Sequence, residues 1–181
     1  MDWEVITMRL AYADPPYIGQ AKRHYKNDPS GIPAQEVDYP ALIEKLLTEY
    51  DGFALSLSAP SLRIIDLLIH GPDPKHPKNL DVRTAAWVKP HCSWKPWNNI
   101  AYTWEPVKFR TVRIKGERPT PRDHIVANST RQRGTHGAKP DEFCDWILGL
   151  IGYKPERDTI EDMYPGSGAF TRAVERRILK T

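Results

Sequence analysis

Two kinds of hydrophobic pattern alternate along the chain. Short β-rich runs predict strands at 5–13, 52–58, around 84–89 and 158–164, with two more strands within 101–114. Apolar residues spaced by three or four positions predict helices at 39–50, 61–70, 140–152 and 169–180. Asp141 is expected to cap the third helix and Gly152 to end it. This succession is typical of an α/β sheet with crossover helices, and 181 residues suit a single domain spanning 1–181.

Composition adds limits on the class of protein. The 26 Lys and Arg against 23 Asp and Glu give a net charge of +3, so a nucleic-acid partner must be argued from local clusters. Cys92 and Cys144 are too few for a disulfide framework, and the histidines lack the spacing of a metal site. No apolar run approaches the ~20 residues of a membrane span, and the first residues lack the pattern of a signal peptide. We therefore expect a soluble, cytoplasmic protein without a metal.

Two loops follow predicted strands at the carboxyl end, where open α/β sheets bind ligands. The first is "DPPY" at 14–17, and the second is "DMYPGSG" at 162–168. In the second loop, Gly166 and Gly168 allow close backbone approach, and the helix that begins at Ala169 directs free N–H groups toward a ligand. Either loop taken alone is equally explained as a turn.

Taken together, the motifs are more specific. "DPPY" after a strand, Lys139-Pro140 opening a helix, and D-x-Y-x-G-S-G after another strand resemble the amino-group DNA methyltransferases that use S-adenosylmethionine. The order is the permuted one, in which the catalytic motif precedes the cofactor motif. The resemblance runs from Ala11 to Val174 and includes "WEPV" at 104–107, a segment common in small phage-type adenine methyltransferases. It implies a Rossmann-like class I methyltransferase sheet and a phage or prophage protein of a bacterial host cell.

The first loop fits the chemistry of this family. The exocyclic amine of adenine is a poor nucleophile because its lone pair is delocalised into the ring. The Asp14 carboxylate and the Pro15 carbonyl, whose direction Pro15 and Pro16 restrict, can each accept one N–H bond and orient that amine. Tyr17 offers an aromatic face for a base flipped from its stack. Aspartate at the first position implies, by resemblance, N6 of adenine as the target and direct transfer of the methyl group.

The resemblance also implies the cofactor site. The methionine part of S-adenosylmethionine is expected to contact Asp162, Tyr164, Gly166, Ser167 and Gly168. Lys139 and Phe143 are expected to close over it from the adjoining helix. Tyr164 stands where the family usually has phenylalanine, and Lys139 is also compatible with a solvated lysine at a helix start.

A nucleic-acid surface is expected in the loops, because no separate recognition domain fits within the chain. The candidate regions are 71–100 and 110–137, where cationic and aromatic residues suit phosphate contact and base stacking. The candidate residues are Trp94, Lys95, Trp97, Arg131 and Arg133. Solvated charge with structural tryptophans explains the same pattern equally well.

The carboxyl-terminal part of the sequence departs from the family. In the family, the helix after the glycine loop leads to a strand with an acidic residue that binds the cofactor ribose, whereas this sequence stops at Thr181. We therefore expect about five main strands, with 158–164 at the sheet edge and a cofactor pocket open on its ribose side. Residues 1–5, with Asp2 or Glu4 as a substitute carboxylate, or a second copy in a homodimer would cover this edge.

Three alternatives stay open. The chain could be a cofactor-binding but inactive partner subunit, although such a subunit would not need Asp14. It could be a plain nucleic-acid-binding module, although the glycine loop would then have no role. It could also act on RNA, and the sequence does not separate RNA from DNA.

Overall fold

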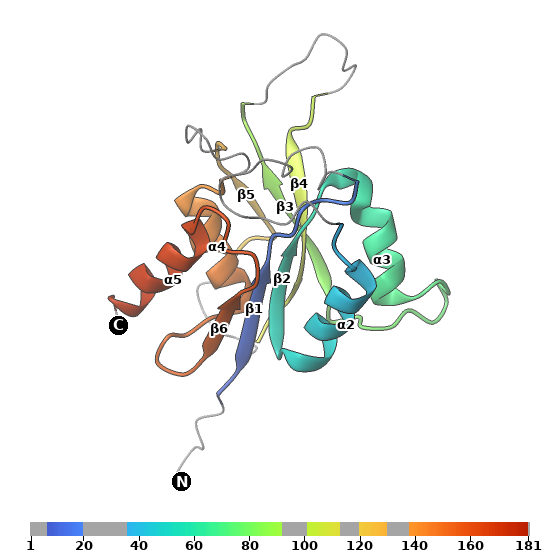
Figure 1. Cartoon of the computed structure of the whole chain (residues 1–181), viewed down its shortest axis with the longest axis horizontal. Helices are drawn as coiled ribbons and strands as arrows, with labels where there is room; N and C mark the ends of the chain where they lie inside the picture. Colours follow the sequence, from blue (N-terminus) through green and yellow to red (C-terminus); the bar gives the residue numbers. More distant parts are fainter. Residues whose placement is uncertain (1–6, 20–35, 92–100, 113–119, 130–137, 181) are drawn as a thin grey trace.

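A computed structural model of the chain describes residues 7–19, 36–91, 101–112, 120–129 and 138–180, which form a six-stranded sheet with helices on both faces (Figure 1). The strands are β1 (Arg9–Ala13), β2 (Gly52–Ser56), β3 (Arg83–Val88), β4 (Trp104–Arg110), β5 (His124–Val126) and β6 (Thr159–Asp162). The helices are α2 (Tyr39–Glu49), η1 (Ala59–Ser61, a 3₁₀ helix), α3 (Leu62–His70), α4 (Asp141–Ile151) and α5 (Ala169–Ile178).

The strands are ordered β5-β3-β4-β2-β1-β6. β1 pairs in parallel with β2 and β6, and β3 pairs in parallel with β5, while β4 runs antiparallel to both β2 and β3. All strands except β4 therefore point the same way. Their carboxyl ends meet at one edge of the sheet, which is the edge expected to bind ligands.

Most of the predicted elements are present, and two predictions about strands were wrong. A single strand, β4, occupies the described part of 101–114, where two had been expected. β5 had not been predicted because its three residues are too few to show an alternating pattern, and pairing with β3 stabilises it instead. Within the described residues the sheet therefore has six strands, where about five were expected.

The ends of α4 confirm one expectation and correct another. Gly152 ends the helix in the left-handed conformation with φ of 83°, as expected of a glycine there. The N-cap is Pro140, so Asp141 is the first helical residue and not the cap. The side chain of Asp141 instead contacts Arg176 of α5, with 3.3 Å between Oδ1 and Nη1.

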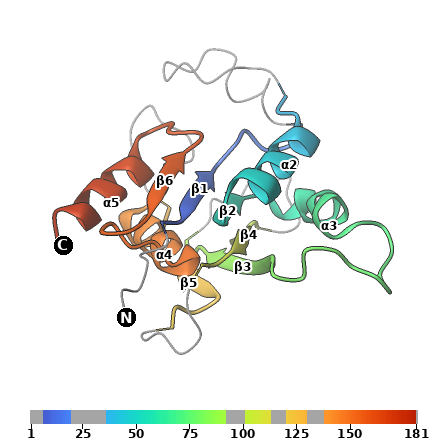
Figure 2. The same cartoon turned by 90° about the horizontal axis from the view of Figure 1, so that it is seen from below.

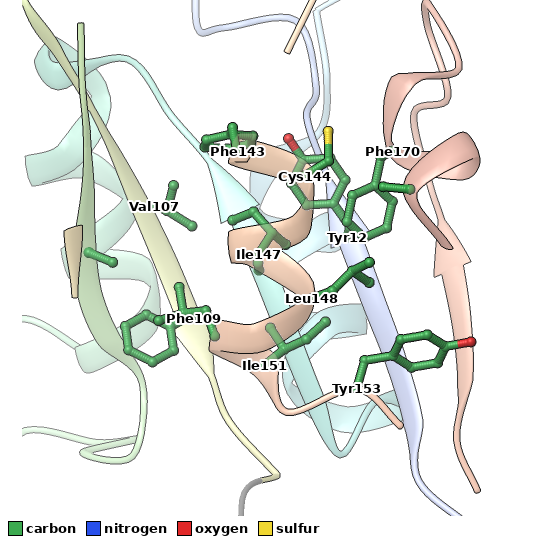
Figure 3. Close-up of a cluster of buried hydrophobic side chains, with 14 of the residues drawn as sticks. Tyr12, Val107, Phe109, Phe143, Cys144, Ile147, Leu148, Ile151, Tyr153 and Phe170 are labelled. Atoms are coloured by element: carbon green, nitrogen blue, oxygen red, sulfur yellow. The ribbon is translucent and has the colours of Figure 1, made fainter. Parts of the chain in front are cut away.

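Each face of the sheet has its own core, so the sheet is the middle of three layers (Figure 2). Side chains alternate along β1: Leu10 and Tyr12 face α4 and α5, while Ala11 and Ala13 face α2 and α3. On the first face, α4 residues pack against Tyr12 and other core residues (Figure 3). The ring centroids of Tyr12 and Phe170 lie 4.2 Å apart. These aromatic contacts give the loop after β1 a rigid base.

β6 forms one edge of the sheet, as expected, and within the described residues it pairs only with β1. Residues 1–5, proposed as a cover for this edge, lie outside the described ranges. In the described part of the chain, no helix combines the length and the apolar character needed to cross a bilayer.

Candidate active site

The loop after β1 is held firmly against the body of the protein. Pro15 and Pro16 are buried, and the hydroxyl of Tyr39 on α2 donates a hydrogen bond of 3.0 Å to the Pro16 carbonyl. Asp14 continues the alternation of Leu10 and Tyr12, so it follows residues of the face covered by α4. The sequence "DPPY" thus places a carboxylate at the carboxyl end of a central strand.

Lys139 is the direct partner of Asp14. Its Nζ lies 3.0 Å from Asp14 Oδ1, and its side chain is only 8% exposed. Lys139 is therefore not a solvated lysine at a helix start. The structure also places it against the first loop, whereas the sequence had suggested a role in closing over the cofactor.

Glu105 on β4 is a site residue that sequence reasoning missed. Its Oε2 accepts a hydrogen bond of 2.8 Å from the Tyr17 hydroxyl and lies 3.4 Å from Lys139 Nζ, while its Oε1 forms an ion pair with Lys89. "WEPV" had been noted only as a family segment, with no role for its glutamate. The available signal was an acidic residue within a predicted strand, between Trp104 and Pro106, since such residues are rarely buried without a partner.

Aromatic rings lie beneath this charged cluster. The Nζ atoms of Lys89 and Lys139 are 4.5 and 5.5 Å from the Trp87 ring centroid, within the range of cation–π attraction. Phe143 had been expected to line the cofactor, but its side chain is fully buried in the core, with its ring centroid 5.8 Å from Lys139 Nζ. The ring of Phe143 thus packs near Lys139 Nζ, and its contact with the cofactor stays a prediction.

The charges of the site shift one another's pKa values. Burial raises the pKa of the Asp14 carboxyl, Lys139 counteracts that rise, and Glu105 and Asp162 add to it. Burial disfavours the charged form of Lys139, but Asp14 and Glu105 raise its pKa above the ordinary value. Burial also acts to raise the pKa of Glu105, and the ammonium groups of Lys139 and Lys89 outweigh it and hold that pKa low. The cluster is thus a set of mutually stabilised ions.

The second loop lies beside the first because β6 is the neighbour of β1. The parallel register sets Asp162 opposite Tyr12, two residues before Asp14. Asp162 Oδ2 accepts a hydrogen bond of 2.8 Å from the Thr171 hydroxyl of α5. Asp162 Oδ1 is buried and has no hydrogen-bond partner among the described residues. A buried carboxylate oxygen of this kind is costly unless a ligand satisfies it.

Glycines shape the backbone between β6 and α5. Gly166 and Gly168 have φ of 45° and 71°, in the left-handed region that favours glycine. A Cβ atom on Gly168 would lie 3.1 Å from Arg172 Nη1, which itself donates to the Ser167 carbonyl at 2.9 Å. Tyr164 is half-buried and packs against the core on the α2 side. Left-handed glycines therefore shape the backbone before the first turn of α5, and a side chain at position 168 would crowd Arg172.

The residues expected to contact nucleic acid lie outside the described ranges, namely Trp94, Lys95, Trp97, Arg131 and Arg133. Their roles stay predictions. Described aromatic residues that precede or begin β4 are exposed at the carboxyl edge, with Tyr102 at 62% and Trp104 at 40%. Within the part of the chain that the structure describes, no three His, Cys, Asp or Glu side chains gather where they could hold a metal ion.

Comparison with known proteins adds information at the level of the fold. No protein-family model matches the chain, and no curated protein sequence matches it. Among solved structures, the chain is similar to the crystal structure of the M1.HpyAVI–SAM complex, with a TM-score of 0.57 and 15% sequence identity. The likeness covers 94% of this chain and 79% of that one. The chain shares this fold. The expected α/β, Rossmann-like sheet with flanking helices is thereby confirmed.

Proposed function

We propose that this protein transfers a methyl group from S-adenosylmethionine to the exocyclic N6 amine of adenine in DNA. The observation that carries the proposal is the placement of Asp14. Its carboxylate ends a central strand, is held by Lys139 at 3.0 Å, and lies beside the loop of Asp162 and the glycines on the neighbouring strand. The proposed amine-orienting group and the proposed cofactor loop lie at the same carboxyl edge of a fold shared with a SAM-bound protein.

The second loop fits the cofactor. Asp162 Oδ1 is buried without a partner in the described part of the chain, and the α-ammonium group of a methionine moiety would satisfy it. Gly166, Ser167 and Gly168 would let the cofactor approach the backbone. The charges of the site also suit a positively charged cofactor, because the three carboxylates of Asp14, Glu105 and Asp162 outnumber the two ammonium groups. When bound, the cofactor supplies an electrophilic methyl group on a positively charged sulfur.

The first loop orients the amine. Lys139 contacts Asp14 through Oδ1, which keeps the carboxylate in one rotamer and leaves Oδ2 to accept an N–H from adenine. The Pro15 carbonyl accepts the second N–H, and the hydrogen bond from Tyr39 to Pro16 prevents this turn from shifting. Tyr17, half-buried beside the same turn, provides the face on which the base lies.

Asp14 also suits the removal of a proton. The amine nitrogen becomes positively charged as its bond to the methyl carbon forms, and it must then lose one hydrogen. Burial raises the pKa of Asp14, and a carboxylate with a raised pKa accepts a proton more readily than an exposed aspartate does. Asp14 Oδ2 is therefore the proposed acceptor.

Several finer parts of the proposal rest on the resemblance of the motifs. DNA is proposed as the substrate because the motifs resemble those of DNA methyltransferases, and RNA stays the alternative that the assay below tests. The remaining parts are a phage-type role in a bacterial cytoplasm, one domain over 1–181, a homodimer across the β6 edge, and a cofactor pocket open on its ribose side.

Methyl transfer from labelled S-adenosylmethionine to unmethylated DNA and to RNA, followed by nucleoside analysis, tests the proposal. We expect the label in N6-methyldeoxyadenosine. Asp14→Ala should yield none, whereas Glu44→Gln, at an exposed position on α2, should behave as wild type. Label in cytosine, label only in RNA, or the absence of any label would each contradict the proposal. Cofactor binding without transfer would favour the inactive-subunit alternative.

A further inference from the structure

Glu105 joins segments that are far apart in the sequence. It lies near the start of β4, yet its carboxylate contacts Tyr17 after β1, Lys89 after β3 and Lys139 before α4. Its side chain is 18% exposed, so these contacts replace most of its water. A buried carboxylate with three polar partners in a candidate active site has a defined geometry, and that geometry constrains each partner.

The contact with Tyr17 fixes an aromatic ring at both ends. The backbone of Tyr17 belongs to the turn held by Pro16 and Tyr39, and its hydroxyl donates to Glu105 Oε2 at 2.8 Å. The hydroxyl oxygen of a tyrosine lies on the long axis of its ring, so holding that oxygen fixes χ1 and the direction of this axis. Because a phenolic O–H prefers to lie in the plane of its ring, the hydrogen bond to Glu105 also favours the ring plane that contains the acceptor. Lys139 Nζ, 3.3 Å from the same hydroxyl, completes the arrangement.

The partners of Glu105 keep it charged. Lys139 and Lys89 hold the pKa of Glu105 below its ordinary value in spite of burial, so the carboxylate stays ionised and accepts the Tyr17 hydrogen bond at neutral pH. Trp87, the cross-strand neighbour of Glu105, underlies both ammonium groups. The acceptor is therefore anchored independently of any substrate.

We propose that Glu105 is a positioning residue for the target base, acting through the Tyr17 hydroxyl to set the orientation of the stacking ring beside Asp14. This inference rests on the proposed function, because it assigns Tyr17 a base to stack on. Glu105 does not touch the reacting atoms in this arrangement. Its effect appears in how well the base is presented and not in how tightly the cofactor is held.

A double-mutant cycle on Glu105→Ala and Tyr17→Phe tests the coupling. Tyr17→Phe keeps the ring and removes only the hydroxyl. We expect Glu105→Ala to lower kcat/KM for nucleic acid about tenfold in the wild-type background. In the Tyr17→Phe background, the same substitution should cause a loss that is smaller by a factor of at least about three. KM for the cofactor should change less than about twofold in each variant. Equal losses in both backgrounds, or a parallel loss of cofactor affinity, would overturn the inference.

A second measurement does not depend on turnover. Fluorescence anisotropy measures the affinity for single-stranded oligo(dA) and for oligo(dT), the probe that lacks adenine. The affinity for oligo(dA) should show the same coupling between the two substitutions, whereas the affinity for oligo(dT) should not. Glu44→Gln is the matched control, because that glutamate is exposed on α2. If Glu105→Ala fails to fold, the isosteric Glu105→Gln replaces it, with a smaller loss of the same pattern expected. Uncoupled losses, or equal losses for both probes, would overturn the inference.

The two proposals fail in different ways. Coupled binding losses without any methyl transfer would overturn the proposed function and leave the role of Glu105 standing. Methyl transfer to adenine with additive losses in the cycle would overturn the role of Glu105 and leave the proposed function standing.

Discussion

Two buried lysines of this protein form ion pairs with aspartates, but they differ in the number of their charged partners and in their position in the sheet. Lys139 is 8% exposed and its Nζ lies 3.0 Å from Asp14. Lys108 on β4 is 3% exposed and its Nζ lies 2.6 Å from Asp66 on α3. By burial and pairing alone, Lys108 would be the better candidate for a functional group. Burial of a charge with a partner is therefore not sufficient to mark an active site.

The surroundings separate the two lysines. Lys139 lies between two carboxylates, Asp14 and Glu105, at the carboxyl edge of the sheet, next to the loop of Asp162. Lys108 pairs with one carboxylate that is half-exposed, and its remaining contacts are Thr84 at 2.9 Å and His70 at 3.3 Å.

The two lysines also lie at different edges of the sheet. Thr84 is near the start of β3, so the Lys108 cluster lies toward the opposite edge of the sheet. It lines an open pocket between α3 and the residues around 71–80. Among the described residues that line this pocket, the carboxylates are those of Asp66 on α3 and Asp73 after α3, and neither directly follows a parallel strand. We assign Lys108 to stability and Lys139 to chemistry.

The largest expected effect on kcat distinguishes Asp14 from Asp66. Asp14→Ala removes the group that orients the amine and should lower kcat at least about a hundredfold, while the cofactor Kd changes less than about threefold. Asp66→Ala should leave kcat within about twofold of wild type. Labelled methyl transfer and isothermal titration calorimetry measure both quantities. An Asp14→Ala variant with more than about a tenth of the wild-type rate would remove the assigned role.

Replacing each of the two lysines by methionine should have different effects on the pH dependence of kcat/KM. Lys139 counteracts the rise that burial causes in the pKa of Asp14, so Lys139→Met raises that pKa further. Less carboxylate is then present at a given pH, and the acid limb of the kcat/KM profile should move to higher pH, with a loss of about tenfold or more near neutrality. Lys108→Met should leave the profile in place. A profile unchanged by Lys139→Met would contradict the coupling.

The Asp66–Lys108 pair should show its effect in stability. Asp66→Asn removes the carboxylate from a buried ammonium group, whose other contacts among the described residues are Thr84 and His70. We expect the free energy of unfolding to fall by about 1–3 kcal/mol, the cost of leaving a buried polar group poorly satisfied. Urea denaturation measures this change, with Glu44→Gln on α2 as the control. A stable Asp66→Asn variant with altered kcat would reverse the assignment of the two lysines.

The smallest effects extend the comparison to glycines. Gly168→Ala places a Cβ in the left-handed region and 3.1 Å from Arg172 Nη1, so stability should fall by about 1 kcal/mol and cofactor affinity should weaken. Gly149→Ala in α4 meets nothing within 4 Å among the described residues, and stability should rise by about 0.4–1 kcal/mol with unchanged affinity. Thermal denaturation with and without cofactor measures both the stability and the cofactor affinity of each variant. If the two variants bind the cofactor equally well, Gly168 has no role in the proposed cofactor loop.

Local chemistry made much of the molecule predictable. Strong periodicity placed the four α-helices of the described residues and most of their strands, because one buried face dictates the spacing of apolar residues. "DPPY" and the glycine loop were recognisable because prolines and left-handed glycines specify backbone conformation within a few residues. β6 was expected at the sheet edge, and it lies there among the described residues. β5 and the N-cap of α4 were not predicted correctly, since three paired residues and a cap depend on their neighbours in space.

The partners of each charge were decided only by the tertiary structure. Lys139 meets Asp14 across 125 positions of sequence because α4 packs on the face of β1 that carries Tyr12, a contact that no local pattern encodes. Glu105 becomes a site residue because β4 enters the sheet antiparallel, so that its first residues lie at the same edge as the carboxyl ends of the other strands. Phe143 is turned into the core by that same packing of α4. Sequence carries the identity of these side chains, whereas packing determines which of them share a space small enough for their charges to interact.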